Sequence, residues 1–166
     1  MEGKIGQIGF VITKTNWLSR AISWFLGSPY SHAFLIINST ETIETDTKEV
    51  HIDSLIDHMT NPNKSCEIYE THNLSQKDKE TILANAKSQL GTRYSYKKFL
   101  YLALYLLLKK IGIRISIRIK GTVCDDVPAI AYKDTDFNEI KETQKDLEEL
   151  RQYIKKSGEW ICVFKH

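Results

Sequence analysis

Cysteine is scarce in this sequence, and its placement argues against two common uses of the residue. The three cysteines, Cys66, Cys124 and Cys162, are odd in number and lie far apart. They do not predict a disulfide framework, and the lack of a C-x-x-C pair argues against a zinc site. Reduced thiols of this kind are typical of cytoplasmic proteins, so we expect this chain to be cytoplasmic.

Long hydrophobic runs and a strong charge of one sign are also missing. The longest unbroken apolar run covers residues 99–108, about half of what a membrane span requires. Residues 1–6 contain no long apolar stretch, so we expect no signal peptide. The formal net charge is +2, which is too small to indicate a nucleic-acid binder.

The composition is that of one folded domain over residues 1–166, with 42% apolar and 27% charged residues. The expected fold class is α+β with an antiparallel sheet, because two kinds of periodicity are present. Apolar alternation predicts strands at 7–13, 32–37, 42–45, 66–70 and 159–164. Helical spacing predicts helices at 17–26, 51–59, 75–90, 97–110, 123–132 and 138–156. Residues 111–120 alternate apolar and basic side chains, which predicts a strand or an extended arm.

Two residues, His32 and Cys124, are the best candidates for catalysis. Nucleophilic thiol catalysis needs a cysteine near a base, and a third polar group that orients the base. His32 opens an apolar strand, and Cys124 opens an expected helix whose free amides would favour a thiolate. The simpler alternatives are a partly buried structural histidine and a small core cysteine.

A carboxylate on the neighbouring strand is the expected orienting group. Glu44 lies on the strand that pairs with the His32 strand, and Asp46 lies two residues further on and faces the same side. Either one could hold the imidazole in the tautomer that accepts a proton from the thiol. The simpler alternative is an exposed strand carboxylate. Asp125 and Asp126 follow Cys124 directly, and their negative charge would disfavour the thiolate.

Four segments occur in an order that resembles a known superfamily. They are Ser31-His-Ala-Phe-Leu-Ile-Ile, Thr42-Ile-Glu-Thr, Gly91-Thr-Arg-Tyr-Ser-Tyr and Val123-Cys-Asp-Asp. In this order the chain resembles the circularly permuted branch of the papain-like NlpC/P60 superfamily, which includes YiiX-like and lecithin:retinol acyltransferase-like proteins. The similarity extends over residues 5 to 135, approximately. In many of these relatives Ser-Glu follows the cysteine, whereas this chain has two aspartates there.

The resemblance implies a permuted papain-like fold, with a central antiparallel sheet packed against helices. It implies a cysteine-dependent hydrolase or acyltransferase in which Cys124 is the nucleophile, His32 the base and Glu44 the polar third member. Gly91 and Tyr94 match an element that packs near the site. We expect no cofactor, and the expected substrates are amide or ester bonds in a peptide, a peptidoglycan-like stem or an acyl-lipid. The alternative is a membrane-binding or partner-binding module that keeps the fold without turnover.

Residues 97–120 form an apolar and basic insertion in this pattern. The apolar run 99–108 is followed by several cations, so it is either a buried core helix with a basic rim or a patch that docks on anionic lipid. An apolar entrance to the expected cleft of His32 and Cys124 would be lined by Trp17, Trp24 and Phe25.

The remaining candidates have simpler expected roles. His51, His58 and His72 show no ligand-like spacing, so we expect no metal, and Cys66 and Cys162 are expected in the core.

Overall fold

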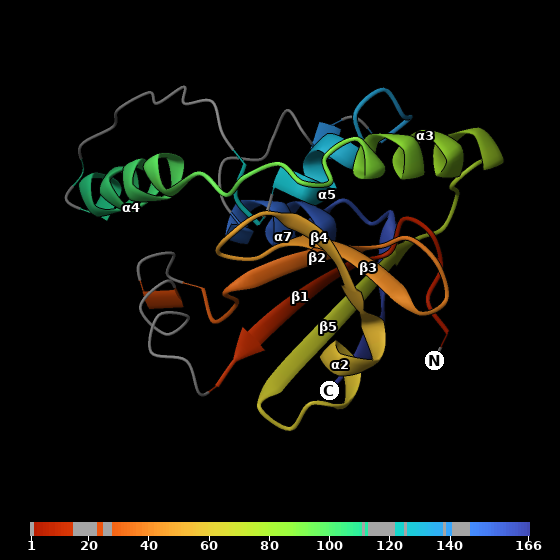
Figure 1. Cartoon of the computed structure of the whole chain (residues 1–166), viewed down its shortest axis with the longest axis horizontal. Coiled ribbons are helices and arrows are strands. Elements are labelled where there is room, and N and C mark those ends of the chain that lie inside the picture. Colours follow the sequence, from red (N-terminus) through yellow and green to blue (C-terminus); the bar gives the residue numbers. More distant parts are fainter. Residues whose placement is uncertain are drawn as a thin grey trace.

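The computed structural model describes residues 2–14, 23–24, 28–110, 112, 122–124, 126–137, 139–140 and 147–166. Its centre is a six-stranded sheet with the strand order β4-β3-β2-β1-β5-β6, in which every neighbouring pair is antiparallel (Figure 1). The strands are β1 (Ile8–Thr13), β2 (His32–Ile36), β3 (Glu41–Thr45), β4 (Val50–Ser54), β5 (Lys64–Thr71) and β6 (Trp160–Lys165). The α+β class and the antiparallel sheet are therefore confirmed.

Five helices are labelled in the described part of the chain: α2 (Leu55–Thr60), α3 (Gln76–Lys87), α4 (Tyr96–Lys110), α5 (Asp126–Ala131) and α7 (Leu147–Lys156). Helix α3 begins where the sequence predicts, because Ser75 and Asp78 form a reciprocal capping box. No helix in the described residues is long and apolar enough to cross a membrane. The expected helix at 17–26 and the expected strand or arm at 111–120 lie almost entirely outside the described residues.

Two sequence predictions about local structure are wrong. The segment 51–59 is not one helix, because Val50–Ser54 pairs with β3 as strand β4 and only the residues after it are helical. Helix α5 begins at Asp126 and not at Cys124, so the cysteine lies in the turn before the helix.

Strand alternation gives the sheet two buried faces with separate cores. On the first face, Phe10 and Leu35 pack with side chains of α3, α5 and α7. On the second, Phe34 and Ile36 pack with Leu55 and Met59 of α2. Figure 1 shows α3, α5 and α7 gathered along one side of the sheet, whereas α2 lies apart from them over β5. By the same alternation, the side chains of His32, Phe34 and Glu44 lie on the second face.

A buried carboxylate joins α7 to the sheet on the first face. Glu67 of β5 accepts hydrogen bonds from Tyr69 Oη at 2.9 Å and from Arg151 of α7 at 3.2 Å. The Arg151 guanidinium also lies 4.2 Å from the centre of the Tyr30 ring. Burial raises the pKa of the Glu67 carboxyl group, but hydrogen bonds from Lys165, Tyr30 and other donors outweigh burial and lower it to about 2. Glu67 also pairs with Lys165 Nζ at 2.8 Å, so the cluster is an ion-pair network that links α7, β5 and β6.

Candidate functional site

The imidazole of His32 and the carboxylate of Glu44 form an ion pair on the second face of the sheet. Phe34 of β2 is directly opposite Glu44 of β3, so His32 at the start of β2 lies diagonally from Glu44 on the same face. The Nε2 atom of His32 lies 2.8 Å from Oε2 of Glu44. Nε2–H therefore donates to the carboxylate, which leaves Nδ1 as the ring nitrogen available for another partner.

The side chain of Cys124 lies close to His32. Its proximity contributes to the raised pKa of the imidazole. The chain is held in place just before the cysteine, because Thr122 bridges in parallel to Tyr94 and its carbonyl accepts a 2.9 Å hydrogen bond from Ser95 N. Cys124 is half-buried.

The charges at the site favour a cationic imidazole between two groups. Burial lowers the pKa of His32, but the Glu44 carboxylate and the nearby Cys124 side chain outweigh burial and raise it to about 10. Burial raises the pKa of the Glu44 carboxyl group, but His32 and His58 outweigh burial and hold it well below its usual range. An imidazolium that contacts a thiol stabilises the thiolate, which is the nucleophilic form of cysteine.

The aspartate two residues beyond Cys124 is neutralised by a lysine. Asp126 accepts a 2.7 Å hydrogen bond from Val123 N, and its two carboxylate oxygens lie 2.5 and 2.6 Å from Lys98 Nζ. The Lys98 ammonium therefore compensates the charge of Asp126, which by sequence alone is expected to disfavour a Cys124 thiolate. The same contacts fix the turn that carries Cys124. Asp125 lies outside the described residues.

The two candidate orienting carboxylates, Glu44 and Asp46, make different contacts in the structure. Strand β3 ends at Thr45, and the exposed Asp46 turns back on its own loop. Its Oδ1 accepts hydrogen bonds from Lys48 N at 2.6 Å and Glu49 N at 2.9 Å. Of the two, Glu44 is the one that contacts His32.

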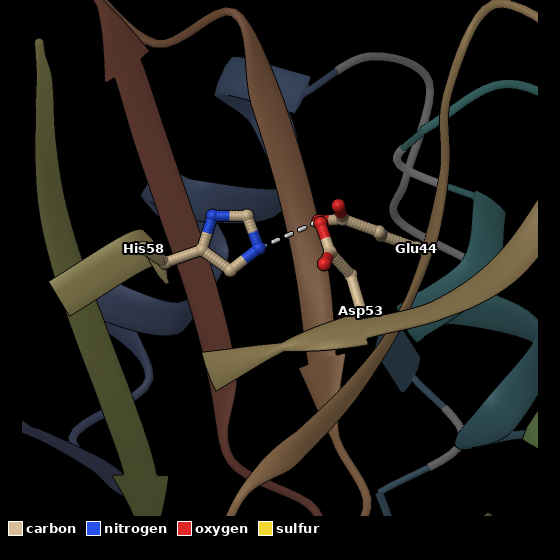
Figure 2. Close-up of side chains that lie close together, drawn as sticks. All are labelled: Glu44, Asp53 and His58. Atoms are coloured by element: carbon tan, nitrogen blue, oxygen red, sulfur yellow. Dashed lines mark ion pairs between the residues drawn. The ribbon is translucent and has the colours of Figure 1, made fainter. Parts of the chain in front are cut away.

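A second histidine contacts Glu44, and sequence reasoning did not place it there. His58 of α2 is 2% exposed, and its Nε2 lies 3.0 Å from the Glu44 oxygen that His32 also contacts. Its ring stacks on Phe34, with 4.4 Å between centroids and 11° between planes. Figure 2 shows His58 of α2, Glu44 of β3 and Asp53 of β4 converging. Each offers one ligand atom within 4.8 Å of the others, which is close enough to hold a metal ion.

Among the remaining sequence candidates, His51 of β4 also lies beside Glu44, with its Nε2 4.0 Å from Oε1. Cys66 is a core residue, and burial raises the pKa of its thiol to about 12. Cys162 is exposed on the edge strand β6, so its expected core position is wrong. Trp24 is exposed, and the Trp17 and Phe25 predictions lie outside the described residues.

Comparison with known proteins adds no family assignment. No protein-family model matches the sequence, and no curated protein matches it significantly.

Proposed function

We propose that the protein is a cysteine-dependent hydrolase that cleaves an amide or ester bond, with Cys124 as nucleophile and His32 as the catalytic acid and base. The observation that carries the proposal is the 2.8 Å contact between Nε2 of His32 and Oε2 of Glu44, at a histidine whose pKa is also raised by the nearby Cys124 side chain. A nucleophile, a base and an orienting carboxylate in contact form the arrangement that thiol catalysis requires.

The chemistry follows from this arrangement. The thiolate of Cys124 attacks the substrate carbonyl, and the His32 imidazolium gives its proton to the leaving amine or alcohol as the carbonyl–leaving-group bond breaks. His32 then takes a proton from water, whose oxygen attacks the thioester and releases the acid and the thiolate. If a second alcohol or amine replaces water, the same steps transfer the acyl group. Glu44 keeps Nε2–H of His32 occupied, so that Nδ1 stays directed at the sulfur.

The element order supports a permuted papain-like fold as part of this proposal. The histidine strand precedes the cysteine in the chain, and the cysteine lies just before α5, which packs over β2 and β3. The resemblance to the NlpC/P60 superfamily extends the proposal to its substrates, which are a peptide, a peptidoglycan-like stem or an acyl-lipid.

Alkylation with an iodoacetamide probe tests the nucleophile without knowledge of the substrate. At neutral pH we expect Cys124 to label at least about tenfold faster than the exposed Cys162, because a neighbouring imidazole activates a thiol toward alkylation. Peptide mapping by mass spectrometry gives both rates in one sample. His32→Ala should reduce the Cys124 rate to that of Cys162. Equal rates in the wild-type protein would overturn the proposed mechanism.

A specific surface feature favours membrane association as a second function. Leu100, Leu104 and Leu107 of α4 are 69%, 45% and 41% exposed, and their spacing places them on one helix face. Of the two sequence alternatives for this run, a fully buried core helix does not fit these side chains. Lys97 and the cations of 109–120 lie beside the apolar run in the sequence, which suits anionic lipid headgroups.

Vesicle sedimentation tests this second function. The full chain should pellet with phosphatidylserine-containing vesicles and much less with pure phosphatidylcholine, because both apolar burial and charge contribute. The variant Leu100→Asp/Leu104→Asp should stay in the supernatant while keeping wild-type alkylation of Cys124. Equal pelleting of the variant and the wild type would show that this face of α4 does not bind lipid.

A further inference from the structure

A buried ring nitrogen on the second face of the sheet makes no hydrogen bond. His58 is 2% exposed, and its Nε2 has no hydrogen-bond partner in the described part of the chain. This atom lies 3.0 Å from Oε2 of Glu44, but the two groups are not aligned for a hydrogen bond. The stack on Phe34 holds the ring in this orientation. Because an unpaired buried polar atom costs stability, the orientation of Nε2 indicates a ligand-binding role.

Two carboxylates lie beside this nitrogen. Glu44 is directly opposite His51, so Asp53, two residues beyond His51 on β4, is a diagonal neighbour of Glu44 on the same face. One atom from each of Glu44, Asp53 and His58 lies within 4.8 Å of the other two. Figure 2 shows the three side chains converging from β3, β4 and α2. The 3.0 Å between Nε2 and Oε2 is the distance expected for neighbouring ligands at a right angle, each about 2.1 Å from a metal ion.

The geometry points to a binding site for a divalent transition-metal ion, formed by Glu44, Asp53 and His58. One imidazole nitrogen with two carboxylates is a donor set that suits Zn²⁺, whereas Ca²⁺ and Mg²⁺ prefer oxygen ligands alone. Three protein ligands leave a fourth tetrahedral position for water or another side chain. This proposal replaces the sequence-based expectation of no metal. That expectation used spacing along the chain, and these three ligands meet only in the folded protein.

His51 offers a further donor beside the three ligands. Its Nδ1 lies 3.2 Å from the carbonyl oxygen of Glu49, which can only accept, so the proton of the neutral ring lies on Nδ1. Its Nε2 then has a free lone pair and lies 4.0 Å from Oε1 of Glu44. Histidines that bind metals usually donate their other ring N–H to a carbonyl or carboxylate in this way. His51 is therefore the candidate for the fourth ligand.

Metal binding at Glu44 is compatible with the contact between Glu44 and His32. A carboxylate has two oxygens with about four lone pairs, so Glu44 can accept Nε2–H of His32 at 2.8 Å and also bind a cation. Carboxylate ligands of metals are commonly hydrogen-bonded by a neighbouring group. The metal site therefore does not depend on the proposed thiol mechanism, and it is tested by binding alone.

Lys64 opposes metal binding from the other side of His58. Its Nζ lies 3.3 Å from Nδ1 of His58 and pairs with Asp57. When Nε2 binds a metal, Nδ1 carries the ring proton and faces the ammonium group, so two donors meet. The lysine stem is flexible and partly exposed, so the ammonium can turn away from the ring while it keeps its pair with Asp57. We therefore expect Lys64→Met to bind Zn²⁺ at least about threefold more tightly than the unsubstituted site.

Calorimetric titration of the full chain with zinc chloride tests the site. The protein carries Cys124→Ser and Cys162→Ser, because thiolates also bind Zn²⁺, and it is freed of metal with EDTA, which is then removed. We expect one equivalent of Zn²⁺ to bind with a micromolar or lower Kd. At a free Zn²⁺ concentration of about 100 times the Kd, the Tm should rise by about 5–10 °C.

Matched substitutions in this protein locate the bound ion. His58→Phe keeps a ring that can stack on Phe34 but has no nitrogen, and Asp53→Asn keeps the shape but removes the charge. Each should weaken Zn²⁺ binding at least about tenfold. His72→Phe and Asp46→Asn change the same residue types outside the cluster and should bind like the unsubstituted site. Circular dichroism in EDTA confirms that each variant is folded.

The outcomes of the titrations are distinct. Weakened binding in the two cluster variants, with unchanged binding in the two controls, would establish the site. No saturable binding in the micromolar range, or equal affinity in the cluster and control variants, would overturn it. A Lys64→Met protein that binds Zn²⁺ no more tightly would contradict ligation through Nε2 of His58. Because the titrated protein lacks the Cys124 thiol, each result is independent of the test of the thiol mechanism.

Discussion

Replacing Glu44 with alanine should lower the free energy of unfolding by about 3–5 kcal/mol, the usual result of removing one partner from a buried ion pair. The substitution removes the carboxylate that lies beside both His32 and the buried His58. Chemical denaturation at neutral pH measures the change. The same variant should lose the fast alkylation of Cys124, because His32 loses both its orienting contact and the carboxylate that raises its pKa.

Glu44→Gln and Asp46→Ala are the matched controls for this prediction. Glutamine keeps the shape and one acceptor oxygen but removes the charge, so it should cost less stability than alanine and still slow alkylation. Asp46→Ala removes the other sequence candidate, which only contacts its own loop, and should leave the alkylation rate unchanged. A Glu44→Ala protein as stable and as reactive as the wild type would contradict the placement of this carboxylate.

The stability of the wild-type protein should fall as the pH rises from about 6.5 to about 10. The pKa of His32 is about 10 in the folded protein and about 6.5 in an unfolded chain. Because the folded value is the higher one, the stabilisation is fully present below pH 6.5 and is lost as the pH rises through the folded pKa. One proton contributes a slope of at most about 1.4 kcal/mol for each pH unit in this window.

Denaturant titrations of the wild type and of His32→Gln over this pH range isolate the contribution of His32. The difference between their free energies of unfolding should shrink toward pH 10, because the stabilising proton of His32 is lost there. A difference that stays constant from pH 6.5 to 10 would show that His32 is not held in its cationic form.

The hairpin that carries the site was predictable from local patterns. The apolar alternation after His32 and the turn at residues 38–40 specify β2 and β3, and the period of two places Glu44 on the face of His32. By register alone, Asp46 would lie more directly opposite His32. Only the structure shows that β3 ends before Asp46 and that the loop uses its carboxylate.

The position of His58 was not predictable from local patterns. Residues 51–59 mix polar and apolar side chains in a way that suits a helix, but β3 offers a free edge that converts Val50–Ser54 into a strand. Because strand β4 extends to Ser54, helix α2 starts at Leu55, and His58 lies beside Glu44. A contact between a short helix and a neighbouring strand depends on tertiary packing, which local periodicity does not encode.

The exposure of α4 and Cys162 also depends on tertiary packing. An apolar run such as 99–108 is compatible with a core helix or a surface helix, because its composition is similar on every face. Cys162 lies in a strand as expected, but β6 is at the edge of the sheet, where this side chain remains exposed. In both cases the sequence determines the element and the packing determines its surroundings.

The most direct test is the rate at which iodoacetamide alkylates Cys124 at neutral pH. In the Cys66→Ala/Cys162→Ser protein Cys124 is the only thiol, so the signal belongs to one residue. We predict that adding His32→Ala lowers this rate by about tenfold or more, because the thiol loses the imidazole that activates it. An equal rate in the two proteins would contradict the assignment of Cys124 as an activated nucleophile.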